Sequence, residues 1–427
     1  MTQHNWQFHT FQLIAQDVEQ TTDPDLAPLS SCGELFRSLL SIVSQYSEGD
    51  FPHTQYKELD ELVTTSSQQL GRTQPGTEKS WRRLHTDASI LRAIVSLGAA
   101  TARECIAILD RAIILSGAAD HARLDLIQDL ITRIQRQYLP LPLFEQSTVP
   151  APTAHDHKAV CTATRAIEAW VFPPSLTTFQ RQSCRQPFIV RGYAADWPAL
   201  NAHPWFSARY LRHVAGSGRI VPVEVGMDYR AKDWTQKIMD WDSFISNLDL
   251  ADNTPPPGQK ETLYLAQHNL FTQFPALKAD IITPDYVYAD IPSSYFPGRQ
   301  LPNNPDQFVC NSWLGPRGTA TPAHTDPYLN LFVQVVGKKT VWTAPPEAGP
   351  SMYSYSSLPG SGLSNTSQVD VFSSSDEQGG EYGEFWEKVV PHAQSATLNA
   401  GDLLYLPPGW WHAMRSESTS FSVSTWF

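Results

Sequence analysis

Several features are absent from this chain of 427 residues, and each absence excludes a class of protein. Its five cysteines form no CxxC pair, which argues against zinc fingers and disulfide frameworks. No apolar run approaches a membrane span, and the first residues lack the pattern of a signal peptide. A net charge of -12 leaves no broad positive field for nucleic acid. We therefore expect a globular nuclear or cytoplasmic protein that binds neither membrane nor DNA directly.

The sequence that is present divides into two halves with different patterns. Up to about residue 140, apolar side chains recur at helical spacing, which predicts stacked helical hairpins, one ending at Gly117 and another helix spanning 125–138. Residues 141–165 are rich in proline and predict an extended linker. Short strand-like runs follow over 166–427 and predict a sandwich or barrel. The segments 288–308 and 349–382 are expected to be surface insertions at its mouth.

Histidine-x-aspartate triplets occur twice, and their contexts differ. His85-Thr86-Asp87 runs into a helical apolar pattern, so Thr86 or Asp87 is expected to cap a helix. His155-Asp156-His157 lies in the predicted linker and is expected to be solvated. The second His-x-Asp triplet, His324-Thr325-Asp326, precedes a strand-like run. Only this last triplet has the surroundings of a metal site.

The register of residues 324–336 strengthens that interpretation. If they form one strand, His324, Asp326 and Asn330 point to the same face. Gly337 and Lys338 then fit a two-residue hairpin turn that pairs Val336 with Lys339. A lysine buried there needs an anion, which the distal carboxylate of a co-substrate such as 2-oxoglutarate would supply. Two imidazoles and one carboxylate leave metal positions open for a co-substrate and O2, with His412 as the third ligand candidate.

Residues 311–339, NSWLGPRGTATPAHTDPYLNLFVQVVGKK, resemble the JmjC family of 2-oxoglutarate oxygenases without a gap. The resemblance extends to residues 221–226, 264–271 and 421–426 and covers roughly 185–427. It implies an α+β chain, in which an all-helical N-terminal domain precedes a double-stranded β-helix (cupin-type jelly roll) with flanking helices. The helical half carries no residue roles over from the family.

The resemblance also assigns roles to residues. Fe(II) would be held by His324, Asp326 and His412. The residues expected to contact 2-oxoglutarate are Tyr264, Thr321, Asn330, Lys339 and Trp426. A pocket for a basic side chain of a protein or peptide substrate would be lined by Glu224, Tyr229, Trp234, Gln267 and Trp313. A carboxylate such as Glu224 pairs with a guanidinium, and a tryptophan such as Trp234 stacks on one.

The chemistry implied is decarboxylation of 2-oxoglutarate to succinate and CO2, coupled to oxidation of a substrate C–H bond by O2. We expect hydroxylation of an arginine side-chain carbon. The same attack on an N-methyl group would demethylate histone lysine instead. Two other classes stay open: a non-catalytic metal-binding cupin that acts as an adaptor through its helical half, and a zinc hydrolase, which would leave Asn330 and Lys339 without a role. Mn, Ni, Co or Zn also suit these ligands.

Overall fold

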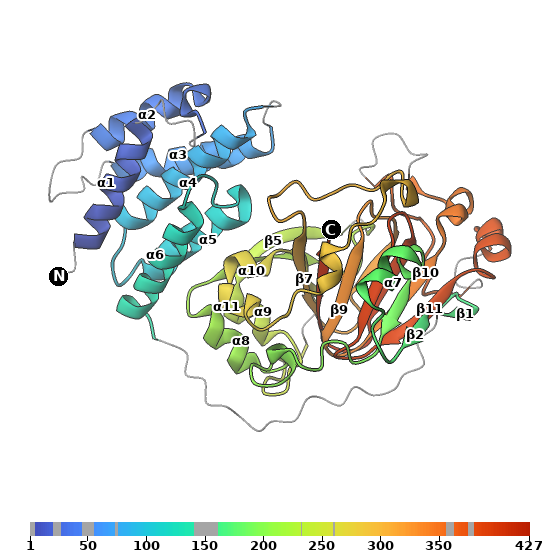
Figure 1. The fold of residues 1–427 in the computed structure, drawn as a ribbon. Coiled ribbons are helices and arrows are strands. Elements are labelled where there is room, and N and C mark those ends of the chain that lie inside the picture. The colour runs from blue at the N-terminus through green and yellow to red at the C-terminus, as the bar shows by residue number, and fades with distance from the viewer. Residues whose placement is uncertain are drawn as a thin grey trace. The chain divides into compact units, whose positions relative to one another are not determined.

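The protein is described here by a computed structural model, in which two compact units are formed by the residues that it describes: 5–19, 27–44, 55–72, 76–140, 161–231, 233–258, 261–355, 363–374 and 380–427 (Figure 1). The helical unit comprises residues 1–143, 215–221 and 239–242, and the sheet unit comprises 144–214, 222–238 and 243–427. Residues 141–160 of the predicted linker lie outside the described residues. We retain domains at 1–140 and 166–427 as a proposal.

The helical unit packs consecutive helices against one another. Its elements are α1 (Asn5–Glu19), η1 (Leu29–Cys32), α2 (Glu34–Ser44), α3 (Gln55–Leu70), α4 (Glu78–Val95), α5 (Ala102–Ser116) and α6 (Arg123–Tyr138). Gly117 adopts the left-handed conformation (φ 70°) and ends α5 as predicted, because glycine has no Cβ to clash there. The predicted helix over 125–138 lies within α6. None of the helices in these ranges is both long and apolar enough to cross a membrane.

The predicted helix cap at Thr86 or Asp87 is wrong, because α4 begins at Glu78 and both residues lie in its interior. Both are buried. The Asp87 carboxylate accepts from Arg123 Nε at 2.6 Å and lies 3.4 Å from Arg83 Nε. The triplet therefore has a structural role inside the helix. His155-Asp156-His157 lies outside the described residues.

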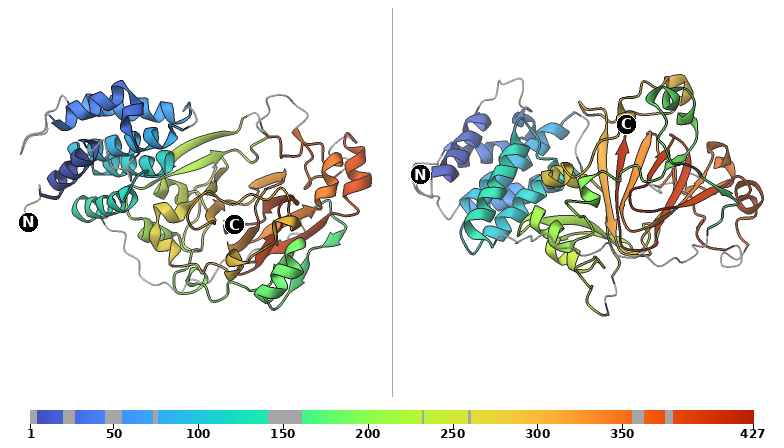
Figure 2. Two further views of the ribbon diagram at one scale, coloured as in Figure 1. Left: turned by 45° about the horizontal axis from the view of Figure 1, so that its top comes forward. Right: turned by 60° about the horizontal axis from the view of Figure 1, so that its bottom comes forward.

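The sheet unit contains two mixed sheets whose strands curve around a common interior (Figure 2). One has the order β1-β11-β10-β13-β8, and the other β2-β3-β12-β9-β14-β7-β6-β4-β5. The strands are β1 (Arg165–Ala166), β2 (Glu168–Trp170), β3 (Phe188–Val190), β4 (Ile220–Val225), β5 (Thr235–Asp240), β6 (Leu263–His268), β7 (Val309–Gly315), β8 (Ala320–His324), β9 (Asn330–Val336), β10 (Lys339–Ala344), β11 (Gln394–Leu398), β12 (Leu403–Leu406), β13 (Trp411–Ser416) and β14 (Ser420–Trp426). The α+β prediction is confirmed.

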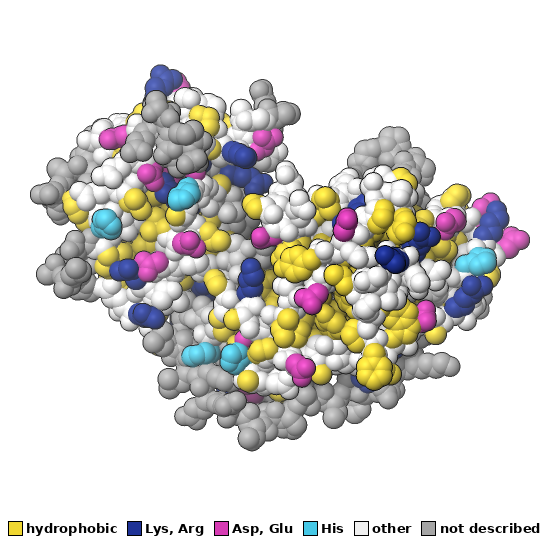
Figure 3. All heavy atoms as spheres, viewed as in Figure 1, with side chains coloured by type: hydrophobic (Ala, Val, Ile, Leu, Met, Phe, Trp, Pro, Cys, Tyr) yellow, Lys and Arg dark blue, Asp and Glu magenta, His cyan; other side chains and the backbone are white. Residues whose placement is uncertain are grey.

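Short helices flank the sheets. They are α7 (Leu176–Arg181), η2 (Ser183–Arg185), η3 (Pro198–Leu200), α8 (Ala208–Ala215), α9 (Trp241–Ser246), α10 (Leu270–Gln273), α11 (Pro275–Lys278), η4 (Asp285–Tyr288), η5 (Ser293–Tyr295), η6 (Pro346–Ser351) and the π-helix η8 (Phe385–Val389). Figure 3 shows acidic and basic side chains interspersed over the faces of both units that are in view. A single basic field is not visible on those faces.

An apolar core fills the space between the two sheets. Phe332 and Leu404 of the larger sheet pack there with Val341 and Met414 of the smaller one. A second apolar cluster covers the other face of the smaller sheet, where Trp342 and Trp411 pack under Met352 and Val369. The described part of the segment 349–382, expected to be a surface insertion, packs apolar side chains such as Met352 and Val369 onto this outer face. Residues 356–362 and 375–379 lie outside the described residues.

The predicted hairpin between Val336 and Lys339 is also wrong. Residues 324–336 form two strands instead of one, since β8 ends at His324 and β9 begins at Asn330. Gly337 and Lys338 then carry the chain from the larger sheet to the smaller one, where Lys339 pairs with Leu398 and Ser416. Gly337 has φ 74°, and a Cβ there would lie 2.0 Å from a backbone oxygen. The crossing needs glycine, and it still turns Lys339 into the interior.

Candidate metal and co-substrate site

Three of the predicted ligands meet at the ends of two paired strands. His324 ends β8 and pairs with His412 of β13, and Asp326 lies in the turn that follows β8. Asp326 Oδ2 is 3.8 Å from His324 Nε2 and 3.6 Å from His412 Nε2. One possible ligand atom from each residue lies within 4.8 Å of the other two. Within the described ranges no other group of His, Cys, Asp or Glu has this arrangement.

The imidazoles are oriented by their backbone neighbours. His324 Nδ1 lies 2.8 Å from the carbonyl oxygen of Pro322, and His412 Nδ1 lies 3.0 Å from that of Trp410. A ring that donates its Nδ1–H to a carbonyl leaves Nε2 with a lone pair. Burial and the neighbouring His324 lower the pKa of His412 to about 4, so its ring is neutral. Both histidines are therefore prepared to coordinate a metal through Nε2.

A cavity of about 270 Å³ opens beside these residues. It is lined by Glu224, Tyr229, Tyr264, Ala266, Gln267, Trp313, Ala320, Thr321, His324, Asp326, Leu363, Asn365, Thr366 and Trp426. The lining includes Tyr264, Thr321 and Trp426 from the predicted co-substrate set, together with four of the five predicted substrate residues. Trp234, Asn330, Lys339 and His412 do not line it.

Lys339 lies behind the Tyr264 ring. Its side chain is 2% exposed, and Nζ is 3.2 Å from Tyr264 Oη. No carboxylate among the described residues is within ion-pair distance, and burial lowers the pKa of Lys339 to about 7. Gly315 makes room for the tyrosine, since a Cβ there would lie 2.6 Å from the ring. The site thus presents a buried cation without its anion.

Two further polar atoms lack partners in the same region. Asn330 Oδ1 and Trp426 Nε1 are buried, and no described group hydrogen-bonds to either. Thr321 hydrogen-bonds to Tyr264. Buried polar groups are almost always satisfied, so orphaned atoms beside a buried lysine point to a polar ligand that completes them. The donors Lys339 Nζ and Trp426 Nε1 fit the oxygens of a bound dicarboxylate, whereas Asn330 Oδ1 is an acceptor and needs a donor.

The cavity wall also carries Glu224 of β4, which pairs with Tyr264 of β6. Trp234 Nε1 donates to Glu224 Oε2 at 3.2 Å, so Trp234 orients the carboxylate from outside the cavity. Burial raises the pKa of Glu224, which means that a cationic partner would stabilise its ionised form. Burial also raises the pKa of Tyr229 to about 12, and the Tyr229 hydroxyl is 3.4 Å from Thr366 Oγ1.

Part of the segment 349–382, which was expected at the mouth of the barrel, completes this wall through Leu363, Asn365 and Thr366. Thr366 forms an isolated antiparallel bridge with His324, and Asn365 Nδ2 donates to the carbonyl of Thr325 at 2.8 Å. Arg230 Nη1 donates to the carbonyls of residues 367–369 at 3.1 to 3.4 Å. Asp228 holds the same guanidinium at 2.6 Å. Residues 363–369 lie far along the chain from 228–230, and no periodicity links the two segments.

Comparison with known proteins agrees with this architecture. The profile of the family described as "Cupin-like domain" matches residues 177–427. The "Lysine-specific demethylase 8" of Danio rerio is 31% identical over 413 residues, which cover 94% of this chain and 93% of that protein. The chain belongs to the cupin-like JmjC family. The resemblance of residues 311–339 is thereby confirmed.

Other members of the JmjC family match a shorter part of this chain. "Jumonji C domain-containing protein 5" of Drosophila melanogaster is 37% identical over 256 residues, 60% of this chain and 58% of that protein. "Lysine-specific demethylase JMJ30" of Arabidopsis thaliana is 37% identical over 241 residues, 56% of this chain and 49% of that protein. The matched segment thus spans about half the length of these two relatives.

Proposed function

We propose that this JmjC protein is an Fe(II)- and 2-oxoglutarate-dependent dioxygenase that hydroxylates a side chain of a protein substrate. The observation that carries the proposal is the pairing of a His-Asp-His group with a buried lysine that lacks an anion. A simple metal-binding cupin would need the first feature and not the second. A zinc hydrolase would leave Lys339 as an uncompensated buried amine.

His324, Asp326 and His412 would hold the metal. Tyr264, Thr321, Asn330, Lys339 and Trp426 would hold 2-oxoglutarate. When bound, iron and 2-oxoglutarate supply the oxidising power, with one oxygen atom of O2 passing to succinate and the other to the substrate. The chain itself binds and orients the co-substrate and the substrate, and it excludes water from the site. Lys339 and the Tyr264 hydroxyl, 3.2 Å apart, would donate charge-assisted hydrogen bonds to the distal carboxylate. The Trp426 ring, stacked on Tyr328 at 5.1 Å, would shield that carboxylate from water.

The substrate side chain would enter between Glu224 and Tyr229 and carry positive charge. Glu224 is the carboxylate that faces the cavity on this wall, and Trp234 fixes its orientation. A guanidinium would find in Glu224 a two-oxygen acceptor, with Gln267 as a further polar neighbour and Trp313 as an aromatic wall. Among protein side chains, arginine matches this set best.

Arginine hydroxylation is tested by mass spectrometry of basic peptides incubated with the protein, iron, 2-oxoglutarate and O2. The expected product carries one additional oxygen atom on an arginine carbon. Loss of a methyl group from a methylated lysine peptide, with no oxygen gained on arginine, would instead support demethylation. That alternative is favoured by the names of the Danio and Arabidopsis relatives, which are lysine-specific demethylases.

An adaptor without catalysis is the second alternative. It predicts that no succinate forms from 2-oxoglutarate even when cell-extract peptides are present. We further propose that the protein acts in the nucleus, the cytoplasm or both, that it binds no DNA directly, and that its helical unit binds a protein partner.

A further inference from the structure

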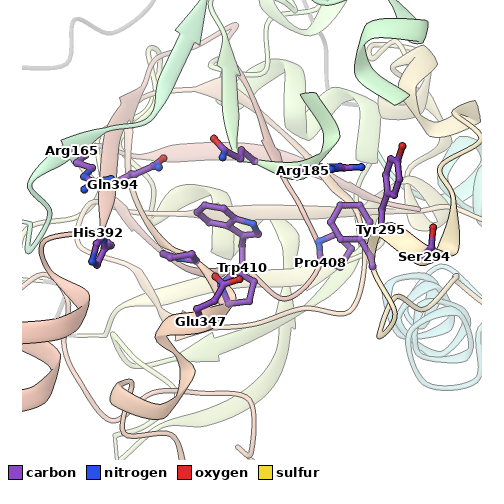
Figure 4. Close-up of a pocket in the computed structure, with 13 residues that line it drawn as sticks. Arg165, Arg185, Ser294, Tyr295, Glu347, His392, Gln394, Pro408 and Trp410 are labelled. Atoms are coloured by element: carbon purple, nitrogen blue, oxygen red, sulfur yellow. The ribbon is translucent and has the colours of Figure 1, made fainter. Parts of the chain in front are cut away.

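A second and larger cavity, of about 590 Å³, lies elsewhere in the sheet unit (Figure 4). Its lining comes from the start of η6 and the residue before it, the start of β11, strand β1, helices η2 and η5, and the loop at 407–410. Arg165, Arg185, His392 and Glu347 supply its ionisable groups, and Trp410 forms part of its wall. None of these residues belongs to the proposed oxygenase site.

The charges in this groove are unpaired. Arg165, Arg185 and Glu347 have no ion-pair partner among the described residues, and the three side chains are exposed. The Arg185 guanidinium lies 4.0 Å from the centre of the Tyr295 ring, a stacking contact that fixes its plane. Two guanidiniums face one carboxylate, so the groove has a positive balance in a chain whose net charge is -12. Its preferred ligand is therefore anionic.

The groove shares its wall with the metal site. Gly409, between the lining residues Pro408 and Trp410, donates its N–H to the carbonyl of Asp326 at 2.8 Å. The carbonyl of Trp410 lies 3.0 Å from His412 Nδ1. The loop at 407–410 thus touches both the groove and two candidate metal ligands. Only the loop at 407–410 separates a ligand in the groove from the candidate metal site.

We propose that this groove binds an acidic segment of the polypeptide substrate while the target side chain occupies the smaller cavity. That the acidic segment belongs to a substrate rests on the proposed function. That the groove binds an acidic peptide does not. In Figure 4, Arg165 and Arg185 lie on either side of Trp410, which suits carboxylates spaced along a chain. Gln186, Ser294 and Gln394 add uncharged polar groups for peptide backbone. The volume accommodates a few residues.

Fluorescence anisotropy of a labelled hexaglutamate peptide tests the proposal on the metal-free protein, with hexalysine as the comparison peptide. We expect hexaglutamate to bind, and the double variant Arg165→Ala/Arg185→Ala to weaken that binding at least about tenfold. Arg37→Ala, at a 74% exposed arginine of α2, is the matched control and should leave the affinity unchanged. Equal affinity in the double variant and the unaltered protein would overturn the proposal.

Glu347→Lys provides the opposite change on the exposed rim. Replacing the negative charge by a positive one should strengthen hexaglutamate binding several-fold, and weaker binding would contradict the proposal. Competition by succinate, compared with sodium chloride at the same ionic strength, shows whether the groove is a peptide site or a site for small anions. Complete displacement of the peptide by succinate would overturn the peptide assignment. Because no metal is present, failure here leaves the oxygenase proposal intact, and failure of succinate formation leaves the groove intact.

Discussion

Lys339 is the residue whose environment departs most from that of an ordinary lysine. Its ammonium is buried against Tyr264 and Phe332 without a carboxylate among the described residues, and its pKa falls to about 7. A bound dicarboxylate would favour the protonated amine and raise that pKa again. Binding above pH 7 must therefore take up a proton, whereas below pH 7 the amine is already charged.

The affinity for 2-oxoglutarate should accordingly be flat below about pH 7 and fall by about tenfold per pH unit above it. Isothermal titration calorimetry at several pH values, with Mn(II) in place of iron, measures this dependence. Lys339→Arg should bind more weakly but without the fall above pH 7, because the guanidinium stays protonated. An unaltered protein whose affinity does not change between pH 6 and 9 would contradict the assigned role.

Glu224→Gln tests the substrate wall. Replacing the carboxylate by an amide keeps the size and the hydrogen bond with Trp234, and removes the charge that would pair with a basic side chain. We expect KM for an arginine-containing peptide to rise by roughly 10- to 100-fold, while 2-oxoglutarate turnover without peptide stays the same. The control is Glu261→Gln, at an exposed carboxylate that pairs with Lys237. An unchanged KM would exclude Glu224 from substrate binding.

At the level of secondary-structure elements, Arg230 holds the segment 367–369 against the cavity wall. Arg230→Lys preserves the charge but removes the guanidinium, whose several N–H groups bond Asp228 and the three carbonyls at the same time. We predict that KM for the peptide rises by about tenfold, with 2-oxoglutarate turnover in the absence of peptide within about twofold of normal. Arg209→Lys, at a 61% exposed arginine, is the control. A loss of kcat without a change in KM would instead indicate a general structural role.

Strand periodicity predicted the elements whose buried residues form continuous apolar runs. The strand-like apolar run at 403–406 coincides with β12, and the runs at 340–343 and 421–427 agree with β10 and β14 within one residue at each end. The run 324–336 was misjudged because Pro327 breaks the strand, and alternation alone does not show that a chain changes sheets at Gly337. Strand β11 was missed because QSATL is mostly polar and only its last residue is buried.

The sequence predicted which residues meet at the site better than it predicted the strands that carry them. His324, Asp326 and His412 lie adjacent as expected, although their roles as iron ligands remain a proposal. The contacts of Arg230 and Thr366 depend on residues more than 100 positions apart, which local patterns do not encode.

At the scale of the whole molecule, the stability of the helical unit depends on a buried ion network. Asp87 is fully buried between Arg83 and Arg123. Asp87→Asn leaves both guanidiniums without that charge and should reduce the free energy of unfolding by about 3–5 kcal/mol. Urea denaturation followed by circular dichroism measures the loss. Asp129→Asn, in a 51% exposed pair with Arg133, should change it by less than about 1 kcal/mol. Equal effects would contradict the network.

The central claim is that one site combines the metal ligands with the co-substrate lysine. Succinate formation from 2-oxoglutarate, with Fe(II), O2 and basic peptides, tests it directly in the unaltered protein, His324→Ala and Lys339→Ala. His121→Ala, at an exposed histidine of the helical unit, is the control. We predict turnover in the unaltered protein and the control, and a loss of more than about 100-fold in the other two. Equal turnover in all four proteins, or none in any, would contradict the account.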